Sequence, residues 1–136
     1  MRPRKSWTER LNDPRPHVVK PAPISIAGMK AGEIMLVPTA LQVDAAIRVI
    51  PKGTAIDVPT LRRRLAAANG AEVTCPITIG YHLRTVAEAA WEAHARGVPD
   101  AKLTPVWRVL DATTPTTARL SCGPGFVLER REREGL

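Results

Sequence analysis

The sequence predicts a mostly helical domain of helix-turn-helix character with an extended N-terminal arm. Three observations predict this class. Apolar residues recur with a 3.6-residue period over much of residues 40–94. A basic helical segment is followed, after a short turn, by a second helical segment. Prolines crowd the first 38 residues. At 136 residues the chain suits one domain with its own core, so we divide it into a Pro-rich basic arm, residues 1–37, and a domain, residues 38–136.

The arm is expected to be mostly extended, because proline fixes φ and lacks a backbone donor. Trp7 and Leu11 lie four residues apart and could anchor one helical turn onto the body. A poorly ordered terminus is the alternative. At the end of the arm, the apolar run of residues 33–37 predicts a strand.

The first helix of the domain is expected over residues 40–49. Thr39 is its predicted N-cap, because a threonine oxygen can accept a hydrogen bond from the first turn. Pro51 to Gly53 ends the helix, and a short extended piece follows at residues 54–56.

Two further helices follow. Asp57 is predicted to cap the second, which carries Pro59 in its first turn and runs to residue 68. The third begins after Cys75 and Pro76 and reaches about His94. Its predicted apolar stripe is Ile79, Leu83, Val86, Ala87, Ala90 and Trp91, and the side chains expected off that stripe are Tyr81, Arg84, Thr85 and Glu88.

The C-terminal third contains three predicted pieces. Residues 103–110 form a buried-looking apolar segment, residues 112–117 form a Thr/Pro-rich loop, and residues 126–135 form a charged helix. Residues 129–134 of that helix carry three arginines and three glutamates, a pattern typical of a solvent-exposed helix face.

Composition narrows the classes of function. The formal net charge of +7 and the pI near 10.3 indicate an anionic partner, with nucleic acid as the first expectation. No apolar run approaches the roughly 20 residues that a membrane helix needs, and no secretory signal follows the basic N-terminus. The two cysteines do not fit a disulfide scaffold, which predicts a cytoplasmic protein with free thiols. We expect no metal site and no cofactor.

The second and third helices of the domain together predict a helix-turn-helix. The third would present Tyr81, Arg84 and Thr85 to DNA, and the basic second helix would contact phosphates through Arg62, Arg63 and Arg64. An all-helical core with a solvated arginine face explains the same pattern.

Two short motifs carry a family resemblance. The family of O6-alkylguanine-DNA alkyltransferases has a stretch F-x3-V-x2-A-L-R-x-I-P-x-G, followed by a helix-turn-helix and an active-site segment P-C-H-R-V-I/V. Residues 105–110 here are Pro-Val-Trp-Arg-Val-Leu. The resemblance covers residues 38–136 in the same order, and the first stretch is matched by Thr39, Val43, Ala46, Ile47, Arg48, Ile50, Pro51 and Gly53.

The chain departs from the family at its reactive residues. The alkyl-accepting cysteine falls on Val106, which has no nucleophile. The activating histidine falls on Trp107, and the tyrosine that helps to rotate the nucleotide falls on Val58. The asparagine before the active-site segment has no counterpart in residues 97–104. The family's arginine finger, which occupies the stack when a base is flipped out, aligns with Arg84. An exposed helix arginine that pairs with Glu88 at i+4 is the alternative for Arg84.

The resemblance therefore implies a fold like the alkyltransferase C-terminal domain, of winged helix-turn-helix character, and the non-enzymatic, alkyltransferase-like branch of the family. Those proteins replace the cysteine, commonly by tryptophan, bind alkylated guanine and recruit repair factors; here the tryptophan stands one position later. Our leading hypothesis is non-enzymatic DNA binding, including the sensing of alkylated or distorted bases, with DNA and a repair protein as partners. The base pocket implied by the resemblance comprises Val58, Pro105, Val106, Trp107 and Arg108. A tryptophan buried in the core is the alternative for Trp107.

Two other classes of function remain open from the sequence. The chain could be a protein-interaction domain that kept the fold without DNA contact. It could also be an enzyme that uses Cys75 or Cys122. A helix dipole could lower the pKa of Cys75, whereas two ordinary inert thiols, or a disulfide between them, are the alternatives.

Overall fold

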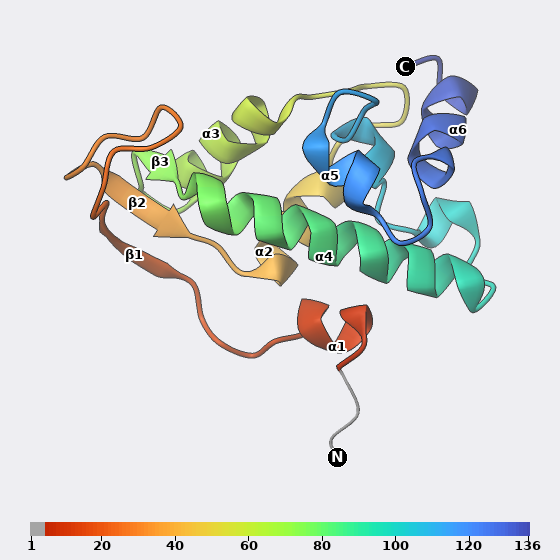
Figure 1. Ribbon diagram of the computed structural model, residues 1–136, viewed down its shortest axis with the longest axis horizontal. Coiled ribbons are helices and arrows are strands. Elements are labelled where there is room, and N and C mark those ends of the chain that lie inside the picture. The colour runs from red at the N-terminus through yellow and green to blue at the C-terminus, as the bar shows by residue number, and fades with distance from the viewer. Residues whose placement is uncertain (1–4) are drawn as a thin grey trace.

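A computed structural model describes residues 5–136. Within this range the chain forms six α-helices, two short 3-10 helices and one three-stranded sheet (Figure 1). The expectation of a helix-dominated fold is confirmed, and the small sheet makes the fold mixed. The sequence predicts a short turn between the second and third helices of the domain. In the structure this connection is longer, because it includes a short strand.

The sheet has the strand order β1-β2-β3. Strand β1 (Val18–Pro21) pairs antiparallel with β2 (Ile34–Val37), and β2 pairs parallel with β3 (Val73–Thr74). Only the β2 strand is anticipated in the sequence. All four residues of β1 are exposed, so this strand lacks the alternation that would predict it, and β3 has only two residues.

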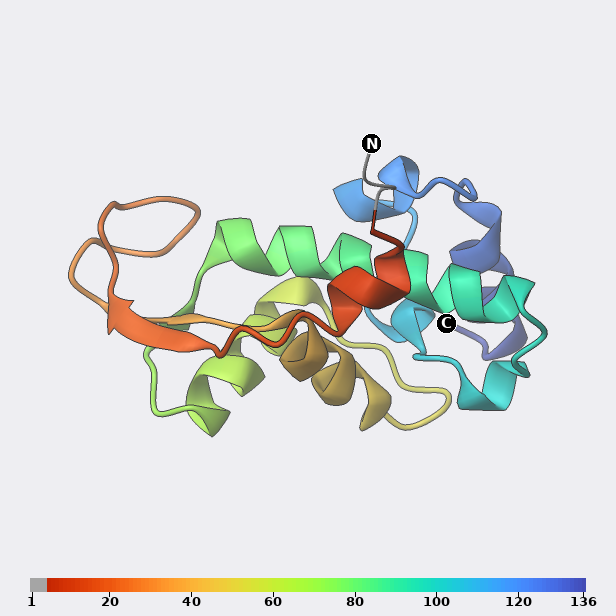
Figure 2. The same cartoon turned by 90° about the horizontal axis from the view of Figure 1, so that it is seen from below.

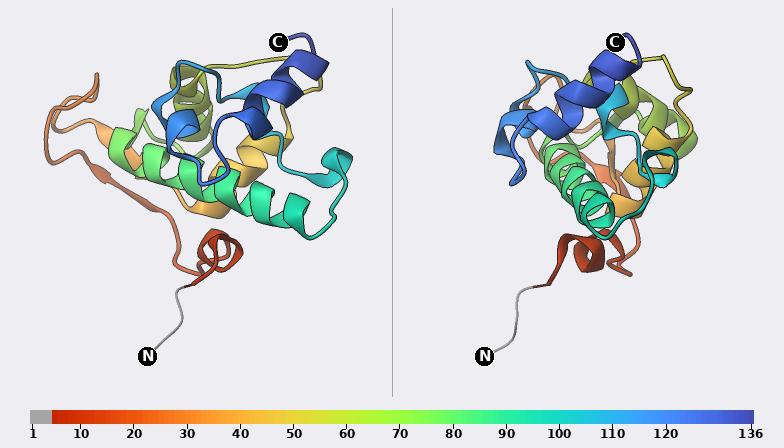
Figure 3. Two further views of the ribbon diagram at one scale, coloured as in Figure 1. Left: turned by 45° about the vertical axis from the view of Figure 1, so that its right-hand side comes forward. Right: turned by 90° about the vertical axis from the view of Figure 1, so that its right-hand side faces the viewer.

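Helix α4 (Pro76–Ala95) is the longest element, and α1 (Trp7–Leu11), α2 (Ala40–Arg48) and α5 (Pro115–Arg119) pack on it. Helix α1 lies on one side of it, and α5 with α6 (Gly125–Arg133) lies on the opposite side (Figures 1 and 3). The predicted apolar stripe of α4 is buried, with Trp91 at its edge. Thr85 and Glu88, expected off the stripe, are buried as well, because later segments cover that side of the helix.

The caps of the next two helices are as predicted. Helix α2 (Ala40–Arg48) begins with a capping box, in which Thr39 and Gln42 each accept a backbone hydrogen bond from the other, both at 3.0 Å. Helix α3 (Val58–Ala68) begins at Asp57, whose carboxylate accepts the Thr60 N–H at 2.8 Å.

The C-terminal segments close the core. The 3-10 helices are η1 (Asp100–Lys102) and η2 (Val106–Arg108). Most of residues 103–110 are buried, and the charged helix predicted at the C-terminus is α6. The predicted loop at residues 112–117 gives way to α5 from Pro115 onward, because proline suits the first turn of a helix.

Residues 5–37 do not form a separate extended arm. The turn anticipated at Trp7 and Leu11 is α1, which packs on α4 (Figure 2). Strand β2 joins the core through Leu36, beside Val43 of α2. The boundary predicted after residue 37 therefore falls between two elements that share one core. In residues 5–136 no helix is both long enough and apolar enough to cross a membrane.

Candidate nucleic-acid interface

The connection between α3 and α4 is held by paired hydrogen bonds. The Thr74 hydroxyl donates to the carbonyl of Arg62 at 2.7 Å, and the Arg62 guanidinium donates to the carbonyl of Thr74 at 3.1 and 3.2 Å. The Arg62 side chain thus joins α3 to β3. This contact engages two of the three guanidinium nitrogens of Arg62, so only Nη1 is left for the predicted phosphate contact.

The next two arginines of α3 face outward. Arg63 donates to the Thr60 hydroxyl at 3.0 Å and lies near Asp57. Hydrogen bonds from Thr60 lower the pKa of Asp57, and the charge of Arg63 lowers it further. Arg64 is exposed and forms no hydrogen bond within residues 5–136. Both guanidinium groups are therefore available to a phosphate backbone.

Helix α4 carries an outward stripe formed by Ile77, Tyr81 and Arg84. The spacing i, i+4, i+7 puts these three residues on one face. Ile77 is 61% exposed and Tyr81 66%, which are high values for large apolar or aromatic side chains. Thr85 does not belong to this face, because it is buried and its hydroxyl donates to the carbonyl of Tyr81. The predicted contact of Thr85 with DNA is therefore wrong.

Arg84 is only loosely held. Its guanidinium forms an i, i+4 ion pair with Glu88, at 3.7 Å, which is longer than a hydrogen bond, and lies 5.2 Å from the ring of Trp7. The pairing with Glu88 that the alternative predicts is therefore present. Its Nε atom is buried and has no hydrogen-bond partner among the described residues. Glu88 instead accepts the Ser121 hydroxyl at 2.6 Å and the Ser121 N–H at 3.1 Å. The Arg84 side chain is 43% exposed, so its terminal Nη atoms, and not the buried Nε, are left for another acceptor.

Helix α1 holds Trp7 beside Arg84. The Glu92 carboxylate accepts the Thr8 N–H and the Thr8 hydroxyl, both at 2.8 Å. Burial alone would raise the pKa of Glu92, but these hydrogen bonds outweigh it and lower the pKa. Arg10 lies 4.4 Å from the Trp7 ring. The spacing of Trp7 and Leu11 is the one sequence feature that predicts a helical turn here. No sequence pattern predicts the contact of this turn with Glu92, which is 84 residues beyond Thr8.

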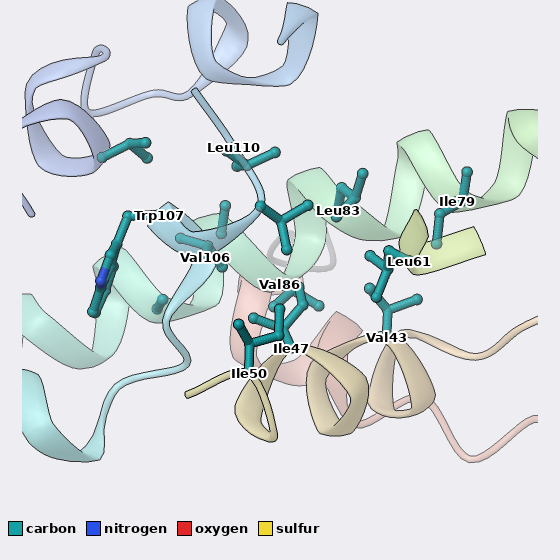
Figure 4. Packing of buried hydrophobic residues seen from close by; sticks show 14 of the residues in the cluster. Val43, Ile47, Ile50, Leu61, Ile79, Leu83, Val86, Val106, Trp107 and Leu110 are labelled. Carbon is teal, nitrogen blue, oxygen red and sulfur yellow. The ribbon is translucent and has the colours of Figure 1, made fainter. Parts of the chain in front are cut away.

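The pocket implied at residues 105–108 is filled by the core. Val106 has no exposed surface, and Pro105 and Trp107 are also buried (Figure 4). Val58 is half-buried against the same cluster. A base cannot stack on Trp107 in this arrangement, because the ring already packs edge-on against Phe126. The expectation of an open base pocket at these residues is wrong, and the core alternative for Trp107 is confirmed.

Arg108 belongs to a buried polar network at Glu134. The Glu134 carboxylate accepts hydrogen bonds from the Arg108 guanidinium at 2.9 and 3.1 Å, from the Trp107 indole at 2.6 Å and from the Gly53 N–H at 2.8 Å. Burial opposes ionisation, but the bonds from Arg108, Gly53 and Trp107 outweigh it and hold the pKa of Glu134 at about 2. This network joins η2, the C-terminus of α6 and the turn after α2, so Arg108 is structural.

Neither cysteine is oxidised in the structure. Cys75 is buried as the N-cap of α4, and the Thr78 hydroxyl lies 3.2 Å from its sulfur. Burial would raise the pKa of Cys75, but the hydrogen bonds with Thr78 and Ile77 lower it overall. Burial and the nearby Glu88 raise the pKa of Cys122. The two residues belong to different apolar clusters, and no group that could hold a metal ion is found in residues 5–136.

Comparison of the chain with models of protein families, with curated proteins and with solved structures found no match.

Proposed function

We propose that the protein is a non-enzymatic DNA-binding protein of the alkyltransferase-like type. The observation that carries this proposal is the state of Arg84. It lies on the outward stripe of α4 beside the exposed Tyr81, and its guanidinium forms no hydrogen bond within residues 5–136. An arginine in this state suits a phosphate oxygen or a base edge, both of which are strong acceptors.

Other exposed side chains support a nucleic-acid ligand as well. Arg63 and Arg64 face outward from the preceding helix and would contact phosphates, which supplies the sequence-independent part of the affinity. Tyr81 offers an aromatic ring on which a base can stack. The net charge of +7 has the sign that attracts a polyanion.

The winged helix-turn-helix is also part of this proposal. Helices α3 and α4 would be its two helices, with the outward stripe of α4 directed at the duplex. Their connection, residues 69–75, is longer than the usual turn of three or four residues and is stiffened by the pairing of β3 with β2. The β1–β2 ribbon would serve as the wing.

The proposal excludes alkyl transfer at residue 106. Valine offers no nucleophile, and this position is wholly buried. If a lesion is sensed, its base must lie on the surface near Tyr81, Arg84 and Trp7 rather than in a pocket at Val106.

Fluorescence anisotropy with labelled duplexes tests the proposal. Duplexes carrying guanine or O6-methylguanine are titrated at two salt concentrations with the wild type, Arg84→Gln, and the double variant Arg63→Gln/Arg64→Gln. We expect binding that weakens steeply with salt, roughly tenfold weaker binding for Arg84→Gln, and a salt slope reduced by about two for the double variant. Tighter binding to the lesion would identify a damage sensor.

Arg133→Gln is the matched control, because Arg133 is an exposed arginine of α6 on the far side of α4 from α1. It removes the same charge and should retain nearly all the affinity. Absence of binding at low salt, or an equal loss in Arg133→Gln and Arg84→Gln, would refute the proposal.

A protein-interaction domain is the second candidate. The observation in its favour is that several arginines serve the interior: Arg62, Arg108 and Arg131 donate to main-chain carbonyls. Part of the positive charge is therefore structural and is not displayed to a ligand. This candidate predicts no binding to either duplex at low salt, so the same titration separates the two.

A further inference from the structure

The loop between β1 and β2, residues 22–33, exposes two isoleucines. Ile24 is 51% exposed and Ile26 is 39% exposed. The same loop buries Ala22 and Met29 against Met35 and Cys75. The loop thus has an inner apolar side that is packed and an outer one that is left to solvent.

The outer side is held in a defined shape. The Ala22 N–H donates to the Glu33 carbonyl at 2.8 Å, and Ile26 and Met29 exchange backbone hydrogen bonds, both at 2.9 Å. Ala27 and Gly28, between them, have φ values of 50° and 84°. Two successive left-handed residues give the tight turn of a hairpin. A side chain on such a loop loses little further freedom when it binds a partner.

Two lysines flank the exposed isoleucines. Lys20 on β1 and Lys30 in the loop are exposed, and neither forms a salt bridge with any residue from 5 to 136. Glu33 is the only acidic residue of the segment 18–37. Its carboxylate accepts a hydrogen bond from the backbone N–H of Lys30, not from the lysine side chain. Along the chain, the two exposed isoleucines of the loop are thus preceded and followed by an unpaired lysine.

The loop lies at the amino end of α4. Figures 1 and 2 both show it beside the first turn of this helix, and the packing of Met29 with Cys75 joins the two. Ile77 and Tyr81 are exposed on the first turns of the same helix. The loop and the first turns of α4 thus lie at the same end of the molecule.

We infer that Ile24 and Ile26 form a wedge that inserts at a flexible or distorted base step of duplex DNA, with Lys20 and Lys30 on the flanking phosphates. This inference rests on the proposed function. Isoleucine is one of the apolar side chains that unstack base steps from the minor groove, and a mismatched or pyrimidine–purine step unstacks at lowest cost. A membrane surface is the less suitable partner, because interfacial anchors use tryptophan, phenylalanine or leucine, and residues 22–33 contain none of these.

The test combines affinity with a stacking probe. A duplex carries 2-aminopurine at a central TpA step, and a second duplex carries a central mismatch. We expect the wild type to raise the 2-aminopurine fluorescence and to bind the mismatched duplex more tightly. The double variant Ile24→Ala/Ile26→Ala should lose the fluorescence rise and bind roughly tenfold more weakly.

Leu41→Ala/Val49→Ala is the matched control, because it truncates two other exposed apolar side chains, Leu41 in the first turn of α2 (44% exposed) and Val49 at its C-cap (75% exposed). It should behave as the wild type in both readouts. Lys20→Gln/Lys30→Gln should lower the salt slope by about two and keep the fluorescence rise. Equal melting temperatures of all variants establish that the fold is intact.

The outcomes separate the two proposals. If Arg84→Gln weakens binding but Ile24→Ala/Ile26→Ala equals the wild type in affinity and fluorescence, the wedge is refuted and the proposed function stands. If the wild type binds no duplex, both are refuted. Binding to phosphatidylserine vesicles that the isoleucine variant loses, with DNA binding unchanged, would assign the loop to a membrane and overturn the wedge.

Discussion

Replacing Glu134 by glutamine should be among the most destabilising changes of a single charged side chain in this fold. The carboxylate accepts four hydrogen bonds from the Arg108 guanidinium, the Trp107 indole and the Gly53 backbone, and it is nearly buried. Glutamine keeps the size of the side chain but removes the charge. It leaves Arg108, itself mostly buried, with only the carbonyl of Ile50 as a strong acceptor.

The magnitude follows from the pKa of Glu134. It is held at about 2 against an ordinary value of 4.5, a difference of about 2.5. At about 1.4 kcal/mol per pH unit, the charged form contributes about 3 kcal/mol to the free energy of unfolding at pH 7. Removing one member of a buried ion pair costs about 3–5 kcal/mol in other proteins, which is consistent.

The low pKa of Glu134 also determines how the free energy of unfolding depends on pH. The folded protein binds this proton less readily than the unfolded chain, so the stabilisation is complete above about pH 4.5 and is lost as the pH falls toward 2. Between pH 7 and pH 3 the wild type should lose about 2 kcal/mol from this group alone. The difference between wild type and Glu134→Gln should therefore shrink from about 3 to about 1 kcal/mol.

Urea denaturation followed by tryptophan fluorescence at pH 7 and pH 3 measures both differences. Glu129→Gln is the control, because Glu129 is an exposed glutamate on the same helix and should change stability by less than about 0.5 kcal/mol. A Glu134→Gln effect below about 1 kcal/mol at pH 7, or an effect equal at both pH values, would refute the network as the source of the low pKa.

Three further predictions follow from the fold and the interface. Thr39→Ala removes the capping box of α2 and should cost about 1 kcal/mol in urea denaturation, whereas Thr39→Ser should cost much less. Trp7→Ala should speed amide hydrogen exchange in α1 while the core amides of α4 stay protected, since α1 docks partly through this ring; unchanged exchange would contradict that docking. Val106→Cys should gain no methyl group, about 14 Da by mass spectrometry, from an O6-methylguanine duplex, because residue 106 is wholly buried. A mass gain would show that this segment opens to substrate.

The candidate interface was only partly predictable. Tyr81 and Arg84 follow from helical periodicity, which leaves them off the apolar stripe of α4. Thr85 and Glu88 fit the same pattern and yet are buried, because Ser121 and its neighbours cover that side of the helix. In the same way, Arg62 cannot be told apart from Arg63 and Arg64 by sequence, since its partner Thr74 lies on the strand after the helix.

The sequence by itself determined the local elements. Thr39 and Asp57 start α2 and α3 because their side-chain oxygens accept hydrogen bonds from backbone groups three residues later, whatever surrounds them. Only the tertiary structure decided which charged side chains are displayed. Arg108 meets Glu134 across 26 residues and Thr8 meets Glu92 across 84. Such pairs form only when packing of the whole chain brings distant segments together, so no local pattern encodes them.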